Sequence, residues 1–182
     1  MQELQGPVLV IGGARSGKSA YAESLVAGHP AVIYVATAPN PPDDPEWHSR
    51  VAAHKLRRPA SWSTLETADL VSVLGHPAGA GAPLLIDSMT AWLTAAMDDA
   101  GSWTGDSTAD GRLRESTDGL LAAWCNGHTS VVAVTDEVGQ GVVPETPSGR
   151  LFRDELGLLN QRLAQAAYAV WFVTAGMAQR LK

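Results

Sequence analysis

Residues 12–19 constrain the fold of this chain more than any other stretch, because they match the pattern G-x-x-x-x-G-K-S. An apolar run at 8–11 precedes them and a helix-like stretch at 18–27 follows, which is the strand-loop-helix context of a phosphate-binding loop. A Gly-rich turn that matched the pattern by accident would not need a strand before it and a helix after it. The loop's amides and the helix N-terminus would hold a nucleoside triphosphate. The predicted phosphate-binding residues are Gly12, Gly13, Ala14, Arg15, Ser16, Gly17, Lys18 and Ser19.

Lys18 and Ser19 have separate expected roles within this loop. The lysine reaches the β and γ phosphates, and the serine hydroxyl is a ligand of Mg²⁺. The sequence therefore predicts a nucleotide site that uses Mg²⁺.

Length and composition set the frame for this site. A chain of 182 residues, of which 45% are hydrophobic, can bury one substantial core, so we expect a single domain over residues 1–182. The net charge of -6 and the lack of a long basic run disfavour nucleic-acid binding. The single cysteine, Cys125, excludes an intramolecular disulfide, and we expect it in the core. No signal peptide or membrane-spanning run is present, so the expected location is cytoplasmic, with no membrane insertion.

Short apolar runs alternate with helical patterns along the chain, which predicts an α/β fold with a mostly parallel sheet and helices on both faces. The expected strands are 8–11, 31–36, 84–87, 131–135 and 169–173, with two further short strands at 62–66 and 177–181. The expected helices are 18–27, 46–55, 68–74, 89–97, 112–124 and 150–167.

Three segments interrupt this pattern. The Pro-rich stretch 39–45 and the Gly- and Pro-containing stretch 136–149 each follow a strand, so both are expected to border the ligand site. Residues 98–110 are rich in Gly, Ser, Thr and Asp and are expected to form a solvated, mobile excursion.

Asp87 is the second candidate for phosphate chemistry. It ends the apolar strand 84–87, and a carboxylate at a strand tip is the form that a second metal-binding element takes in phosphate-loop enzymes. The alternative is that Asp87 caps the helix expected from residue 89, although Ser88 could do this instead. We favour the metal role.

The basic stretch 50–59 contains the third candidate. Arg50 and His54 share a helix face, and Lys55, Arg57 and Arg58 follow. Neighbouring cations disfavour the imidazolium form, so His54 would be neutral and available as a nucleophile or base. The alternative is an ordinary solvated helix end with a bystander histidine.

Taken together, several motifs resemble one family, the bifunctional adenosylcobinamide kinase/adenosylcobinamide-phosphate guanylyltransferases of cobalamin biosynthesis. The resemblance runs in order along essentially the whole chain. It is carried by residues 12–19, 34–38 (Tyr-Val-Ala-Thr-Ala), 50–59 with Trp62 and Glu66, 85–87, 135–145, 152–154, 159–164 and 170–171.

This resemblance implies a RecA-like phosphate-loop fold, a homotrimer and two reactions. ATP or GTP phosphorylates adenosylcobinamide, and GMP from GTP is then transferred to that phosphate through a guanylyl-histidine, which maps onto His54. Glu66 would accept hydrogen bonds from the guanine N–H groups. The other nucleotide-binding positions carried over are Ala36, Thr37, Ala38, Lys55, Leu56, Arg57, Arg58 and Asp87.

The chain departs from the family pattern at a few places outside the phosphate loop and His54. Ala95 stands where Asn is common, Gln140 stands where an apolar residue is common, and 98–110 and 145–150 match poorly. Two other functions remain open from the residues alone. One is a monofunctional phosphate-loop kinase of another alcohol, and the other is a nucleotide-switched RecA-like module.

Overall fold

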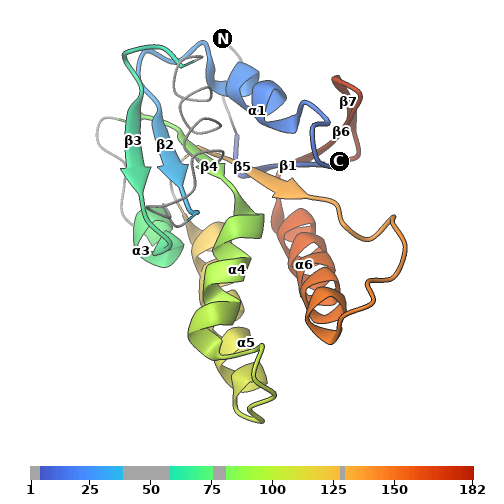
Figure 1. Ribbon diagram of the computed structural model, residues 1–182. Helices are drawn as coiled ribbons and strands as arrows, with labels where there is room; N and C mark the ends of the chain where they lie inside the picture. The colour runs from blue at the N-terminus through green and yellow to red at the C-terminus, as the bar shows by residue number, and fades with distance from the viewer. Residues whose placement is uncertain (1–4, 39–57, 76–80, 128–129) are drawn as a thin grey trace.

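The computed structural model describes residues 5–38, 58–75, 81–127 and 130–182, and over these residues it contains a seven-stranded sheet (Figure 1). The strand order is β3-β2-β4-β5-β1-β6-β7, and every pairing is parallel except that of β7 with β6. The strands are β1 Val8–Gly12, β2 Ile33–Ala36, β3 Ser63–Glu66, β4 Leu84–Asp87, β5 Val131–Asp136, β6 Ala169–Thr174 and β7 Met177–Arg180.

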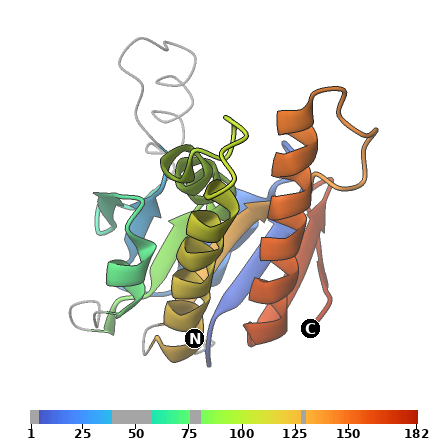
Figure 2. The same ribbon diagram turned by 90° about the horizontal axis from the view of Figure 1, so that it is seen from below.

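Helices cover both faces of this sheet, as the alternating pattern predicted. Helix α1 lies on one face, and α3, α4, α5 and α6 lie on the other (Figures 1 and 2). The helices are α1 Lys18–Val26, α3 Leu70–Gly75, α4 Met89–Ala100, α5 Ala109–Asn126 and α6 Pro147–Ala166. The helix expected at 46–55 and the loop expected at 39–45 lie outside the described residues.

Two core clusters correspond to these two layers. Val10 and Val134 pack with Val26 of α1, whereas Leu9 and Ala133 belong to the larger core under the other helices. Successive side chains of a strand point to opposite faces, so a strand buried on both sides needs an uninterrupted apolar run. Strand β1 meets this requirement, because all five of its residues are buried.

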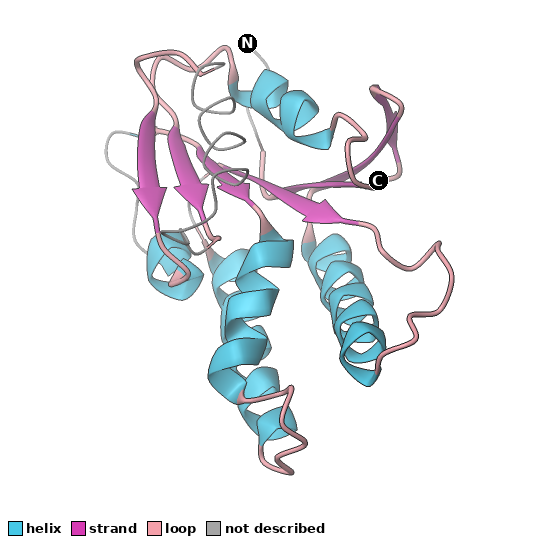
Figure 3. Ribbon diagram, in the orientation of Figure 1, coloured by secondary structure: helices cyan, strands magenta, loops and turns pink. Residues whose placement is uncertain are grey.

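The sheet places the ends of its parallel strands at one edge, where the site is built. In the strand register, Gly12 is the partner of Asp136, and Ala36 is the partner of both Asp87 and Glu66. Strands β1, β2, β3, β4 and β5 therefore deliver their last residues to a common edge, from which loops lead to the helices (Figure 3).

Two helices begin or end beyond their expected bounds, and this shortens the irregular segments. Helix α4 runs to Ala100 and α5 starts at Ala109, so most of the expected 98–110 excursion reduces to a short solvated connection. Arg112 fixes this connection, because its Nε donates to Ala100 O at 3.0 Å and its guanidinium lies 2.6 Å from the Asp106 carboxylate.

Helix α6 starts at Pro147, within the stretch expected to be loop. Thr146 is its N-cap, with Oγ1 accepting from the Gly149 N–H at 3.1 Å. Proline is well suited to the first helical position, since its missing N–H would have no partner there. Pro147 and Gly149, which suggested a loop, therefore lie in the first turn of a helix.

The expectation of a buried Cys125 is wrong, because this residue is exposed. Leu120, Leu121 and Trp124 turn one face of α5 into the core, and Cys125 lies about 100° further round the helix from Trp124. Among the described residues, no helix is both long and apolar enough to cross a membrane.

Candidate nucleotide site

The phosphate loop joins β1 to α1, and two of its glycines are required by close packing. A Cβ at residue 12 would lie 2.5 Å from both Ser16 Oγ and Val173 O, so only glycine fits there. Gly17 has a φ of 95°, which disfavours any residue with a side chain. The turn between β6 and β7 supports the loop from outside, since the Gly176 N–H donates to Ser16 O at 2.8 Å.

Lys18, the first residue of α1, lies across this loop. Its Nζ is 2.7 Å from Asp136 Oδ1 and donates to Gly13 O at 3.2 Å. The two side chains of the ion pair are 13% and 28% exposed, so the pair is shielded without being buried. Lys18 is thus placed beside the backbone of the loop, and its contact with the β and γ phosphates stays a prediction.

Asp136 is a site residue that the sequence reasoning did not single out. It ends β5 in the same way that Asp87 ends β4, so the signal that identified Asp87 was available here too. Both carboxylates point toward the α1 face, because Leu85 and Val134, each two residues earlier, pack in the α1 core. The structure therefore has two acids on the phosphate-loop side of the edge.

The backbone of Asp136 is fixed from two helices. Its N–H donates to Thr90 Oγ1 of α4 at 2.9 Å, and its carbonyl accepts from Asn160 Nδ2 of α6 at 3.0 Å. The buried Thr135 hydroxyl donates to Asn160 Oδ1 at 2.7 Å, which fixes the orientation of this amide. Paired buried polar groups of this kind hold a strand end rigidly.

Asp87 is oriented by Tyr34 of the neighbouring strand. The phenol donates to Asp87 Oδ2 at 2.8 Å, and the tyrosine is 6% exposed. Burial, followed by the negative charge of Asp87, raises the pKa of Tyr34, so the phenol stays protonated as a donor. Helix α4 is capped by Ser88, whose Oγ accepts from the Ala91 N–H at 3.2 Å. The alternative role of Asp87 as the cap is therefore not the one observed.

Thr37 joins β2 to the start of α4. Its Oγ1 donates to Ser88 O at 2.6 Å and accepts from the Ser88 N–H at 2.9 Å, and the residue is 2% exposed. This side chain fixes the backbone directly after Asp87. A nucleotide contact of Thr37, and of the half-buried Ala36 and Ala38, stays a prediction.

Two further predicted residues, Glu66 and Arg58, lie toward the β3 side of the edge. Glu66 ends β3 and is exposed, as a base-reading residue would need to be. The Arg58 guanidinium lies over the Tyr34 ring, 3.2 Å from its centroid, so a cation contacts the same tyrosine that holds Asp87. The other members of the basic stretch lie outside the described residues, and these are Arg50, His54, Lys55, Leu56 and Arg57.

The donor set at this edge suits Mg²⁺. Mg²⁺ is usually held by one or two carboxylates together with substrate phosphates and water, rather than by a complete protein cage. Asp87 and the half-buried Ser19 hydroxyl offer such a partial set. Within the described ranges, no group of three or more His, Cys, Asp or Glu side chains could form a cage.

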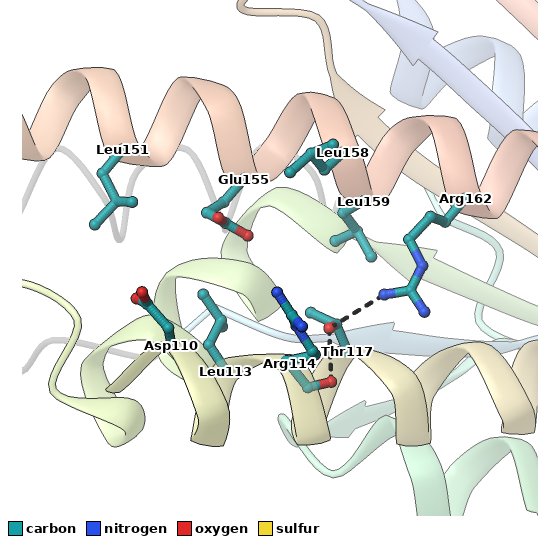
Figure 4. Close-up of a pocket in the computed structure, with 9 residues that line it drawn as sticks. All are labelled: Asp110, Leu113, Arg114, Thr117, Leu151, Glu155, Leu158, Leu159 and Arg162. Atoms are coloured by element: carbon teal, nitrogen blue, oxygen red, sulfur yellow. Dashed lines mark hydrogen bonds between the residues drawn. The ribbon is translucent and has the colours of Figure 1, made fainter. Parts of the chain in front are cut away.

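A cavity of about 340 Å³ lies between α5 and α6, on the other side of the sheet from Lys18 (Figure 4). Its lining mixes leucines with charged groups, and Arg162 donates to Thr117 Oγ1 across it at 3.4 Å. Burial, followed by the charge of Asp110, raises the pKa of Glu155 in this lining. The predicted phosphate-binding residues are absent from this lining, which makes the cavity separate from the phosphate loop.

A solved structure shares this fold. It is described as a prototypical ATPase from the type III secretion system of pathogenic bacteria, with a TM-score of 0.59 at 13% identity. The match covers 93% of this chain and 51% of that chain, so this chain spans about half of the ATPase. The sheet order and this likeness confirm the expected RecA-like phosphate-loop fold.

Curated relatives match over almost the full length. The bifunctional adenosylcobalamin biosynthesis protein CobU of Salmonella typhimurium is 38% identical, over 96% of this chain and 99% of its own. CobP of Pseudomonas aeruginosa, with the same description, is 39% identical, over 96% of each chain. The model of the family described as cobinamide kinase / cobinamide phosphate guanyltransferase matches residues 8–181. The chain therefore belongs to the cobinamide kinase / cobinamide phosphate guanyltransferase family.

Proposed function

We propose that this chain carries out two successive reactions on one corrinoid. It phosphorylates adenosylcobinamide with ATP or GTP, and it then transfers GMP from GTP to that phosphate, giving adenosylcobinamide-GDP and pyrophosphate. The observation that carries this proposal is the full-length match to bifunctional relatives, at 38% identity over 96% of the chain. A kinase of another alcohol, or a nucleotide-switched module, would not require such a match.

The kinase reaction is assigned to the phosphate loop and the strand tips. Lys18 would contact the β and γ phosphates, while Ser19 and Asp87 would hold Mg²⁺, which supplies neutralisation of phosphate charge. Tyr34 supports this role of Asp87, because its hydrogen bond fixes the carboxylate in one orientation. The substrate hydroxyl would then attack the γ-phosphorus and lose its proton to solvent, while the bond from this phosphorus to the bridging oxygen breaks and the nucleoside diphosphate leaves.

The guanylyl transfer is assigned to His54. A neutral imidazole nitrogen would attack the α-phosphorus of GTP, and the bond to the departing pyrophosphate would break. An oxygen of adenosylcobinamide phosphate would then attack the same phosphorus, releasing His54 by cleavage of the P–N bond. Lys55, Arg57 and Arg58 would offset the charge that collects on the phosphorus and on pyrophosphate. Glu66 would select guanine through its N–H groups.

The assembly and location of the protein are part of the same proposal. By its resemblance to the family, we expect a homotrimer. From the length, charge and hydropathy of the chain, we expect one domain over residues 1–182 and a cytoplasmic enzyme that binds neither nucleic acid nor membrane. Light scattering coupled to size-exclusion chromatography would test the trimer through the molar mass in solution.

Product analysis tests the two reactions separately. Purified protein is incubated with adenosylcobinamide, Mg²⁺ and ATP, and GTP is added in a second step, with mass spectrometry after each. We expect adenosylcobinamide phosphate after the first step and adenosylcobinamide-GDP with pyrophosphate after the second. Formation of the phosphate alone would contradict the guanylyl transfer, and no corrinoid product at all would contradict the proposed substrate.

A further inference from the structure

We propose that Asp136 makes the phosphate site select metal-bound nucleoside triphosphates over metal-free ones. Its carboxylate holds Lys18 while no nucleotide is bound, and it repels phosphate charge that no metal ion compensates. This inference rests on one part of the proposed function, namely that the phosphate loop binds a triphosphate.

The position of Asp136 supports the first half of this inference. Strand β5 pairs with β1, and Asp136 is the register partner of Gly12, the first residue of the phosphate loop. The Lys18 ammonium is 2.7 Å from the Asp136 carboxylate and 3.2 Å from Gly13 O. A triphosphate that contacts Lys18 must therefore compete with Asp136 for the same ammonium.

The backbone contacts of Asp136 support the second half, because they keep its carboxylate at this edge. Thr90 and Asn160 fix its N–H and carbonyl from α4 and α6. The next residue is also tied to the loop, since the Glu137 N–H donates to Gly12 O at 3.1 Å. The Asp136 side chain is thus anchored on the phosphate side, and it stays there when Lys18 turns to a bound phosphate.

Charge then separates the two forms of the nucleotide. A metal-free triphosphate carries the full negative charge of its phosphates. Its Mg²⁺ complex carries two negative charges fewer. Repulsion from Asp136 therefore acts mainly on the metal-free form. At a partly exposed edge this repulsion is screened, and we expect it to weaken metal-free binding by about 5- to 30-fold.

A direct metal-ligand role for Asp136 is the competing explanation, and the observed contacts favour selection. The Asp136 carboxylate forms an ion pair with the Lys18 ammonium. Asp87 instead accepts a hydrogen bond from the neutral Tyr34 phenol, which does not neutralise the Asp87 charge. The two explanations predict opposite results for the same substitution, which makes them separable.

The experiment is isothermal titration of a non-hydrolysable GTP analogue, with Mg²⁺ and then with EDTA, into the parent and Asp136→Asn. The asparagine keeps the shape of the side chain and the backbone contacts with Thr90 and Asn160. Asp118→Asn is the matched control, because it removes the carboxylate by which Asp118 of α5 forms an exposed ion pair with Arg162 of α6. Asp136→Ala repeats the test without a polar side chain, and thermal unfolding checks the fold of each variant.

We expect Asp136→Asn to tighten binding in EDTA by about 5- to 30-fold and binding with Mg²⁺ by less than about threefold. Asp118→Asn should match the parent in both conditions. Equal changes in both conditions, no change, or weaker binding with Mg²⁺ would each overturn the inference, and the last would assign Asp136 to the metal. If the parent itself binds no triphosphate in either condition, the proposed function fails and this inference fails with it.

Discussion

Lys18 is the residue at which the phosphate chemistry can be tested most simply. Lys18→Ala removes a charge that is already positioned beside the phosphate loop, so we expect γ-phosphate transfer to fall by roughly 100- to 1000-fold or more. Lys182→Ala is the matched control, since Lys182 is exposed at the C-terminus and contacts Ala164 O and Gln165 O. Full kinase activity of Lys18→Ala would contradict the assignment of the site.

Tyr34 tests the metal role of Asp87 without altering the acid itself. Tyr34→Phe removes the hydrogen bond to Asp87, and a hydrogen bond to a charged group is worth about 1.5–3 kcal/mol. We expect a higher Mg²⁺ concentration for half-maximal kinase activity. Tyr168→Phe, which loses an exposed hydrogen bond to Gln5, is the control. An unchanged Mg²⁺ requirement in Tyr34→Phe would show that Asp87 is not oriented for the metal by this bond.

Glu66 tests the reading of the base. Glu66→Gln turns one acceptor toward the guanine N–H groups into a donor, which leaves polar groups mispaired at a cost of about 1–3 kcal/mol. We expect the affinity for GTP to fall while that for ATP stays near the parent value, and titration of both nucleotides measures this. Glu145→Gln provides a control at another exposed glutamate. Equal affinities of the parent and Glu66→Gln for GTP would mean that guanine is read elsewhere.

At the residue scale, sequence reasoning located what a local motif defines and missed what the fold brings in. Lys18 and Asp87 follow from their neighbours in the chain, and the structure places both at one edge. The ion pair of Lys18 with Asp136 joins residues that are 118 positions apart in the sequence, and no local pattern predicts this pairing. Cys125 was misplaced because a shift of one residue on a helix changes the face that is buried.

At the scale of elements, we expect Glu155 to make the packing of α5 against α6 sensitive to pH. Burial raises the pKa of Glu155 above its ordinary value, so the folded chain holds this proton more tightly than the unfolded chain. The free energy of unfolding should therefore decrease as the pH rises through the unfolded and then the folded pKa, and stay lower above it. Because Glu155 is only partly buried, solvent screens this effect and we expect a change of only fractions of a kcal/mol.

Glu155→Gln should remove this decrease in the free energy of unfolding at higher pH. Urea unfolding should find the variant more stable than the parent at pH 7, with the difference disappearing at a pH below the unfolded value. Glu115→Gln, at an exposed position of α5, controls for the change in net charge. A variant that is less stable than the parent at pH 7 would show that the carboxylate makes a net favourable contact in this lining.

The elements also show where sequence patterns stop being informative. Buried parallel strands are short, uninterrupted apolar runs, and all five main strands were found with small differences at their ends. The two further short strands expected at 62–66 and 177–181 are also present, as β3 and β7. Helix α6 was predicted too short because Pro147 and Gly149 were taken for loop residues. The support of the phosphate loop by the β6–β7 turn depends on tertiary packing, which no local pattern contains.

At the scale of the whole molecule, the alternating pattern predicts a parallel sheet but not its strand order. The order places β5 between β1 and β4, so Asp136 lies closer to the phosphate loop in the sheet than Asp87 does. Strand order is set by long-range pairing, and the resemblance implied only a RecA-like fold, without an order of the strands. The same resemblance, confirmed by the family match, is the basis for two reactions in one chain.

Labelling with GTP that carries radioactive phosphorus at the α position tests the central claim most directly. The account predicts label bound to the parent protein through a P–N bond that is labile in acid and stable in base. His54→Ala should carry no label and make no adenosylcobinamide-GDP, while it still phosphorylates adenosylcobinamide through the phosphate loop. Undiminished label on His54→Ala, or adenosylcobinamide-GDP formed by a parent that never becomes labelled, would contradict the account.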